Sequence, residues 1–127
     1  MRKCFTLFLL ACLILLAAGC ASTITNLTPS HQPRNASGMY PIEAAWDTRQ
    51  QSVRAHTIKP YVLVDFESYP MRPTLGISNR WETVVPVPAD QKSINYHFKF
   101  DYEYNAMGKP EKGSKLSPGY KLDILDK

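Results

Sequence analysis

Side chains that could act as acids, bases or metal ligands recur at every second position between Ile94 and Tyr104. Polar and apolar residues alternate there, and the polar set includes His97, Lys99, Asp101 and Glu103. A pair of carboxylates can hydrolyse a glycosidic bond when one acts as general acid and the other as nucleophile or base. These two acids are only two residues apart beside a lysine, which is also the pattern of an exposed cross-strand ladder of charges. We therefore favour a solvated charged face over a hydrolytic pair.

Metal and cofactor chemistry has less support in the sequence. The three histidines, His31, His56 and His97, are scattered, whereas a zinc site needs three or four converging ligands. A metal role for His97 with Asp101 is the alternative to a solvated face. Motifs such as Gly-x-Ser-x-Gly, His-Glu-x-x-His or a phosphate-binding glycine-rich loop do not occur. The sequence predicts a protein that is not an enzyme, binds no metal and takes no cofactor.

The most specific chemical signal is a cysteine near the N-terminus. Arg2 and Lys3 precede an apolar run, and the segment ends in Leu16-Ala-Ala-Gly-Cys20. A basic start, a short apolar core and small residues are typical of a secretory signal, and crossing a bilayer would need about 20 apolar residues. An ordinary signal peptide cleaved near Gly19 is the alternative, but it leaves the position of Cys20 unexplained.

The stretch that ends at Cys20 resembles the lipobox of bacterial lipoproteins, with Ala17 where that motif usually has leucine. The resemblance implies that a diacylglycerol is attached to the sulfur of Cys20 and that the signal is cut just before it. In that family an aspartate after the cysteine marks retention at the inner membrane, and this chain has Ala21. Stable anchoring needs more than one acyl chain, which the family supplies on one cysteine. We expect a lipid-anchored protein of the bacterial envelope, at the outer membrane.

The chain is long enough for one domain after this signal. Removal of residues 1–19 leaves 108 of the 127 residues. Residues 20–37 carry the lipidated cysteine and are rich in polar residues and proline, which predicts a tether. Part of this tether, with Ile24 and Leu27, has the composition to dock as an edge strand. Residues 38–127 are expected to form the folded domain.

Cysteine and charge counts narrow the class of protein further. Cys4 and Cys12 lie in the signal and Cys20 would carry lipid, so the folded domain has no disulfide and depends on packing. Without Arg2 and Lys3 the 15 basic residues fall to 13, against 11 acidic ones, a net charge of +2. That charge describes an ordinary surface, and we expect no nucleic-acid partner.

The dominant period of the sequence after Gly38 is two, the period of β-strands. Strands are predicted over residues 40–47, 53–58, 61–66, 81–87, 94–104 and 120–124. The third is apolar on both faces and so should be central. Loops are predicted over 67–80 and 105–119, and the ten prolines argue against helices. This pattern predicts an all-β fold, a two-sheet antiparallel immunoglobulin-like sandwich of six or seven strands.

The aromatic residues suggest both the core and a contact surface. Trp46, Trp81 and Tyr96 occupy strand positions that should face the core. Tyr69, Tyr102 and Tyr104 lie in a loop or near a strand end, where we expect more exposure. The loop over residues 67–80 also carries Arg72, which makes it a candidate surface for a partner.

Several short pieces resemble the early-set immunoglobulin-like glycogen-binding domains that precede branching enzymes and isoamylases. The pieces, in order, are Val62-Leu-Val-Asp-Phe66, Tyr69-Pro-Met71, Arg80-Trp-Glu82, Val85-Pro-Val-Pro88 and Tyr96-His-Phe-Lys-Phe-Asp101. The resemblance implies sugar contacts at Tyr69, at Lys99 and at Tyr102 or Tyr104. The first tryptophan of that family is missing here, and its Asp-Gly turn is replaced by Asp101-Tyr102.

Two functions follow from the sequence. The first is a non-catalytic protein-binding or assembly module that presents residues 67–80, with Tyr69 and Arg72, to an envelope protein while Cys20 attaches the chain to the membrane. The alternative is a carbohydrate-binding module that uses Tyr69, Lys99 and Tyr104, so that the partner would be a glycan.

Overall fold

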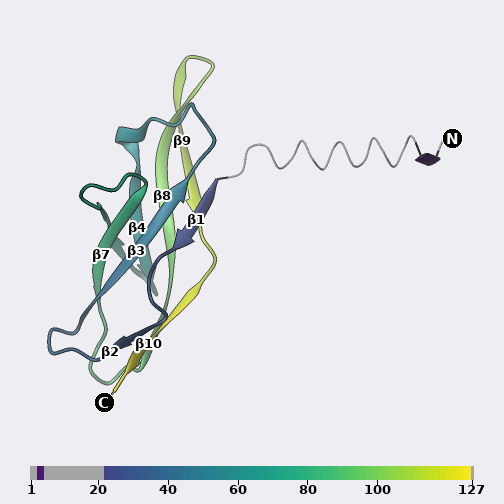
Figure 1. The fold of residues 1–127 in the computed structure, drawn as a ribbon. Helices are drawn as coiled ribbons and strands as arrows, with labels where there is room; N and C mark the ends of the chain where they lie inside the picture. The colour runs from purple at the N-terminus through teal and green to yellow at the C-terminus, as the bar shows by residue number, and fades with distance from the viewer. Residues whose placement is uncertain (1–2, 5–21, 127) are drawn as a thin grey trace.

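Two β-sheets pack face to face in the computed structural model, which describes residues 3–4 and 22–126 (Figure 1). Cys20 and the apolar run before it lie outside the described residues. The strands of the smaller sheet, in spatial order, are β1 (Thr23–Asn26), β3 (Met39–Asp47), β7 (Arg80–Pro86) and β6 (Arg72–Pro73). Those of the larger sheet are β2 (His31–Pro33), β10 (Tyr120–Leu125), β8 (Ser93–Ala106), β4 (Lys59–Val64) and β5 (Glu67–Pro70), and β9 (Lys109–Leu116) pairs with the second half of β8.

The order of the strands identifies the fold. An immunoglobulin domain has strands A, B, E and D in one sheet and G, F and C in the other, to which variable-type domains add further strands. The order β1-β3-β7-β6 matches the first sheet, and β10-β8-β4-β5 matches the second with one added strand. The pairs are antiparallel except β2 with β10, which are parallel. The protein is an immunoglobulin-like β-sandwich, as the sequence predicts.

Alternating residues of the longest strands form the core. In β3 the inward side chains are Tyr40, Ile42, Ala44 and Trp46, and in β8 they are Ile94, Tyr96, Phe98 and Phe100. Phe100 lies between the two tryptophans, with its ring centroid 5.2 Å from that of Trp46 and 5.4 Å from that of Trp81. Many immunoglobulin domains join their two sheets with a disulfide. Residues 22–126 contain no cysteine, so here the two sheets are held together by this aromatic packing.

The sandwich begins earlier than the sequence predicts. β1 and β2 lie within residues 20–37, and they join different sheets through pairing with β3 and β10. The predicted tether is therefore too long, and the suggested edge strand containing Ile24 is present. The inward polar side chains concealed these strands: Asn26 Nδ2 donates to Tyr96 Oη at 2.9 Å, and buried Gln32 donates through Nε2 to the carbonyl oxygen of Pro41 at 2.9 Å.

Three further segments differ from the predictions. Residues 53–58, predicted as a strand, form the 3-10 helix η2 (Ala55–Thr57) and an isolated bridge between Val53 and Tyr104. The predicted loop over 67–80 contains β5 and β6, and the predicted loop over 105–119 contains β9. These strands are short or lie at sheet edges, so they lack the apolar alternation on which the prediction depends. Among the described residues no helix has the length and apolarity to span a membrane.

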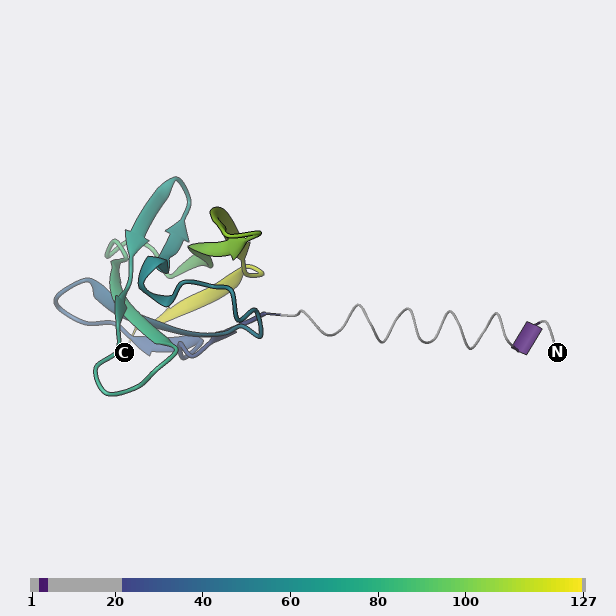
Figure 2. The same ribbon diagram turned by 90° about the horizontal axis from the view of Figure 1, so that it is seen from above.

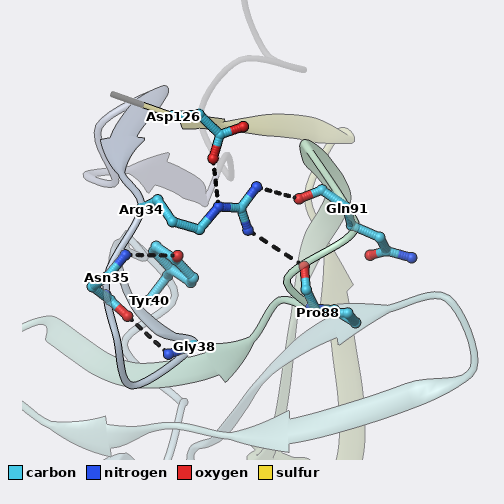
Figure 3. A network of polar contacts seen from close by, with 7 residues as sticks. All are labelled: Arg34, Asn35, Gly38, Tyr40, Pro88, Gln91 and Asp126. Carbon is cyan, nitrogen blue, oxygen red and sulfur yellow. Dashed lines mark hydrogen bonds and ion pairs between the residues drawn. The ribbon is translucent and has the colours of Figure 1, made fainter.

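A polar network closes the end of the sandwich where β10 finishes (Figure 3). The Arg34 guanidinium donates from Nε to Asp126 Oδ1 at 2.8 Å, from Nη2 to the Gln91 carbonyl oxygen at 2.8 Å and from Nη1 to the Pro88 carbonyl oxygen at 3.4 Å. One side chain thus connects the segment after β2, the β7–β8 connection and the end of β10. The hydrogen bond from Arg34 lowers the pKa of the Asp126 carboxyl below its ordinary value near 3.8.

Substitution of Asp126 by asparagine should lower the melting temperature at neutral pH, since it removes the charge that Arg34 favours. A lowered folded-state pKa means that the carboxylate contributes stability above pH 3.8 and loses this contribution as the pH falls through the lowered pKa. The melting curves of wild type and Asp126→Asn should therefore converge in acid. Calorimetry across pH would check this, with exposed Asp90→Asn as a control, and a difference that persists in acid would contradict it.

Candidate functional site

The charged residues of β8 lie together on the outer face of the larger sheet. They lie there because the residues between them face the core, and all four are half-buried: His97, Lys99, Asp101 and Glu103. Strand pairing sets their neighbours. On β4, Tyr61 is opposite Lys99 and Lys59 is opposite Asp101; on β9, Ser114 is opposite Asp101 and Lys112 is opposite Glu103.

The two acids of this face are engaged with nearby polar groups. Asp101 Oδ2 lies 3.5 Å from Lys99 Nζ, and Asp101 Oδ1 accepts a hydrogen bond from Ser114 Oγ at 2.8 Å. Glu103 Oε2 lies 4.0 Å from Arg54 Nη1. The first ion pair lies within β8 and the second involves Arg54, which precedes η2, so the predicted cross-strand ladder exists only in the register, which places lysines of β4 and β9 opposite these two acids. Within residues 3–4 and 22–126, no three His, Cys, Asp or Glu side chains are grouped so as to hold a metal ion.

A groove of about 810 Å³ opens over this face. The helix η2 lies on one side of it and β9 on the other. Thr57 fixes η2 to β8, since its Oγ1 accepts from the Glu103 backbone N–H at 2.9 Å and donates to the Arg54 carbonyl oxygen at 2.6 Å. The side chains that give the groove its chemistry are His56, Lys59, Tyr61, Asp101, Glu103 and Lys112. They combine both signs of charge with one aromatic ring, which suits a polar ligand surface that carries both signs.

The structure separates the residues for which the resemblance implied sugar contacts. Tyr102 and Tyr104 lie on the core side of β8, with ring centroids 6.2 Å apart, and Tyr102 packs 5.1 Å from Trp46. Lys99 points to the opposite side of the same strand. Tyr69 on β5 is half-buried against the core, opposite Val62. The three tyrosines are therefore less exposed than the sequence analysis predicts. Tyr69, Lys99 and Tyr104 do not meet at one place.

Arg72 lies in β6, at the edge of the smaller sheet. Its side chain is 80% exposed, and Nε lies 3.6 Å from Glu82 Oε1. It borders a shallow depression of about 320 Å³ that is also lined by Pro70, Met71, Thr83 and Val84. Pro70 is opposite Tyr61 across β4 and β5. The depression therefore continues around the β5 edge towards the groove face.

The groove residues that the sequence analysis did not propose come mainly from outside β8. His56, Thr57, Lys59, Tyr61 and Lys112 belong to η2, β4 and β9, and only strand register brings them beside Asp101 and Glu103. No sequence motif links these positions. The polar side of β8 was one available signal, because it carries Asp101 and Glu103, and Tyr102, a candidate from the sequence, also borders the groove.

Comparisons with known proteins add little beyond the architecture. No protein-family model matches the chain, and no curated protein does. Among solved structures, murine CRIg can be superposed with a TM-score of 0.41 and 10% sequence identity, covering 83% of this chain and 98% of that one. A likeness at this TM-score carries no argument about this chain. The immunoglobulin-like fold is identified by the order of strands in the two sheets, described above.

Proposed function

We propose that this protein is held at the bacterial outer membrane by lipid on Cys20 and that its sandwich is a non-catalytic module that binds an envelope protein. The observation that supports binding is the groove of about 810 Å³ on the outer face of the larger sheet. The immunoglobulin-like fold supplies a rigid support for such a surface, although function depends on the site rather than on the fold.

The groove and the depression beside Arg72 form the proposed contact surface. Charges of both signs, from Lys59 and Lys112 and from Asp101 and Glu103, would select a partner by complementary charge. Tyr61 supplies the aromatic side chain that most often dominates binding energy at such surfaces. Because Pro70 connects the groove face to Arg72, one partner can contact both.

The binding role can be tested by crosslinking in intact envelopes. Tyr61→Ala combined with Arg72→Ala should reduce the recovered partner by on the order of tenfold, the effect of losing about 1.4 kcal/mol. The matched control is Asn95→Ala with Lys121→Ala, a cross-strand pair of exposed residues on the same sheet outside the groove. Circular dichroism would confirm that both variants fold. Equal recovery of every partner from both variants would refute this surface.

Lipid attachment has its own test. Mass spectrometry of the N-terminal peptide should show the mass of a diacylglycerol on Cys20, and Cys20→Ser should release the protein from the membrane fraction. Release is expected because stable anchoring depends on the acyl chains that the Cys20 sulfur carries. An unmodified thiol at Cys20 in protein recovered from membranes would refute the anchor and leave the groove to be tested separately.

A carbohydrate-binding module is the second candidate, and the observation that favours it is Tyr61 in the groove. Tyrosine rings offer an apolar face to a sugar together with a polar tip, and the surrounding charged groups can bond its hydroxyls. Isothermal titration with glucans and envelope glycans should give heat that disappears in Tyr61→Ala. The absence of heat at millimolar ligand would exclude this candidate.

A further inference from the structure

The hairpin between β8 and β9 has an apolar residue at its tip. Met107 and Gly108 form the two-residue turn, with φ of 50° and 80°. This turn favours Asn-Gly or Gly-Gly, because side chains other than Asn and Asp are disfavoured at positive φ. The Met107 side chain is nevertheless fully exposed, at 104%. A long apolar side chain thus occupies a position where neither packing nor backbone geometry calls for it.

The tip lies at the end of the sandwich where the described part of the N-terminal segment begins (Figures 1 and 2). β1 starts at Thr23, opposite Asp47, and the adjacent Trp46 packs against Tyr102 of β8. From Tyr102 the hairpin continues four residues to Ala106, a rise of roughly 13 Å at about 3.3 Å per residue. The tip therefore projects well beyond the start of β1.

The position of Cys20 in the sequence matches this projection. Cys20 is three residues before Thr23, so an extended chain would reach about 10 Å from the start of β1. Lipid on Cys20 and the tip of the hairpin can therefore occupy the same level. Membrane anchoring at Cys20 would then place Met107 at the bilayer surface without any change in the sandwich.

A basic side chain beside the tip fits the same surface. Lys109 is exposed directly after the turn. An isolated apolar tip needs no complementary cavity in a fluid interface, and a lysine beside it can extend its ammonium group to anionic headgroups.

We propose that the β8–β9 hairpin is a second membrane contact, in which Met107 inserts into the interface of the bilayer that carries the lipid on Cys20. The proposal rests on the anchor of the proposed function. Its consequence is a fixed orientation: the long axis of the sandwich stands away from the membrane, and the end closed by Arg34 and Asp126 points outward from the bilayer.

Tryptophan substitution at two equally exposed tips tests this. Phe66, 103% exposed, lies in the β4–β5 turn at the opposite end of the sandwich and provides the matched control. Met107→Trp and Phe66→Trp would be prepared as mature lipidated protein in vesicles of phosphatidylethanolamine and phosphatidylglycerol with brominated acyl chains. Trp46 and Trp81 are buried, so their emission forms a common background. We expect quenching and a blue shift for Met107→Trp and neither for Phe66→Trp.

Equal quenching at both positions, or none at Met107→Trp, would overturn the proposal. The proposal would also be overturned if brominated lipid did not quench the fluorescence of Met107→Trp but added envelope proteins shifted its emission. A protein would then cover the tip. If mass spectrometry shows no lipid on Cys20, the same variants can be coupled through that thiol to a maleimide lipid. Quenching at position 107 alone would then support the hairpin contact even though the natural anchor had been refuted.

Discussion

Phe100→Ala should lower the free energy of unfolding by about 3–5 kcal/mol, the usual effect of truncating a fully buried phenylalanine. Phe100 is 0% exposed and packs between Trp46 and Trp81. Its removal would leave a cavity between the two sheets and deprive both indoles of a packing partner. Since domains of this kind are stabilised by only about 5–15 kcal/mol, the loss would be a large fraction of the total.

Urea unfolding followed by tryptophan fluorescence would measure this effect, because Trp46 and Trp81 report directly on the site. Phe66→Ala is the matched control: it makes the same substitution at a fully exposed turn and should change the unfolding free energy by no more than about 0.5 kcal/mol. Similar effects for the two variants would mean that the aromatic cluster is not the main source of stability.

Gly113→Ala should destabilise the protein by about 1–3 kcal/mol, the range observed when atoms are forced into a packed site. A Cβ at this position would lie 2.7 Å from two ring carbons of Tyr102 and 2.9 Å from its hydroxyl oxygen. The Tyr102 ring covers Gly113 across the β8–β9 pair and also packs against Trp46. The ring would have to move, and its packing against the tryptophan would weaken.

Thermal unfolding of Gly113→Ala, Gly119→Ala and a double variant with Tyr102→Ala would test this account. Gly119 has open space around its Cβ position, so Gly119→Ala should be nearly neutral. In the double variant the clash is absent, and the two effects should not add. Additive effects would show that Gly113 is required for a reason other than the tyrosine ring.

Long alternating strands could be predicted from the sequence, whereas edge strands could not. β8 has fourteen residues and β3 has nine, which is enough to display a period of two. β9 pairs with β8 along its whole length. Its sequence, Lys-Pro-Glu-Lys-Gly-Ser-Lys-Leu, has no apolar side, and every residue of the strand except the half-buried Gly113 is exposed. Such lysines and prolines are typical of edge strands, since they discourage pairing with another chain.

The candidate site was only partly accessible from the sequence. Alternation alone placed Lys99, Asp101 and Glu103 on a common face, and the structure confirms this. Tyr61 joins them through the register between β4 and β8, a relation over 38 residues of chain that no local pattern encodes. Tyr102 and Tyr104 are less exposed than their proximity to the strand end suggested, because β9 extends the sheet beside them.

The parallel pairing of β2 with β10 affects when the domain can fold. β2 is among the first strands in the chain, yet its partner is formed by residues 120–125, so the ribosome must make almost the entire sandwich before this pair can close. Contacts between such distant segments slow folding and leave edges open in the meantime. Chains that stop before Tyr120 would expose the unpaired side of the first half of β8 as well as β2, which makes them natural targets for chaperones and proteases.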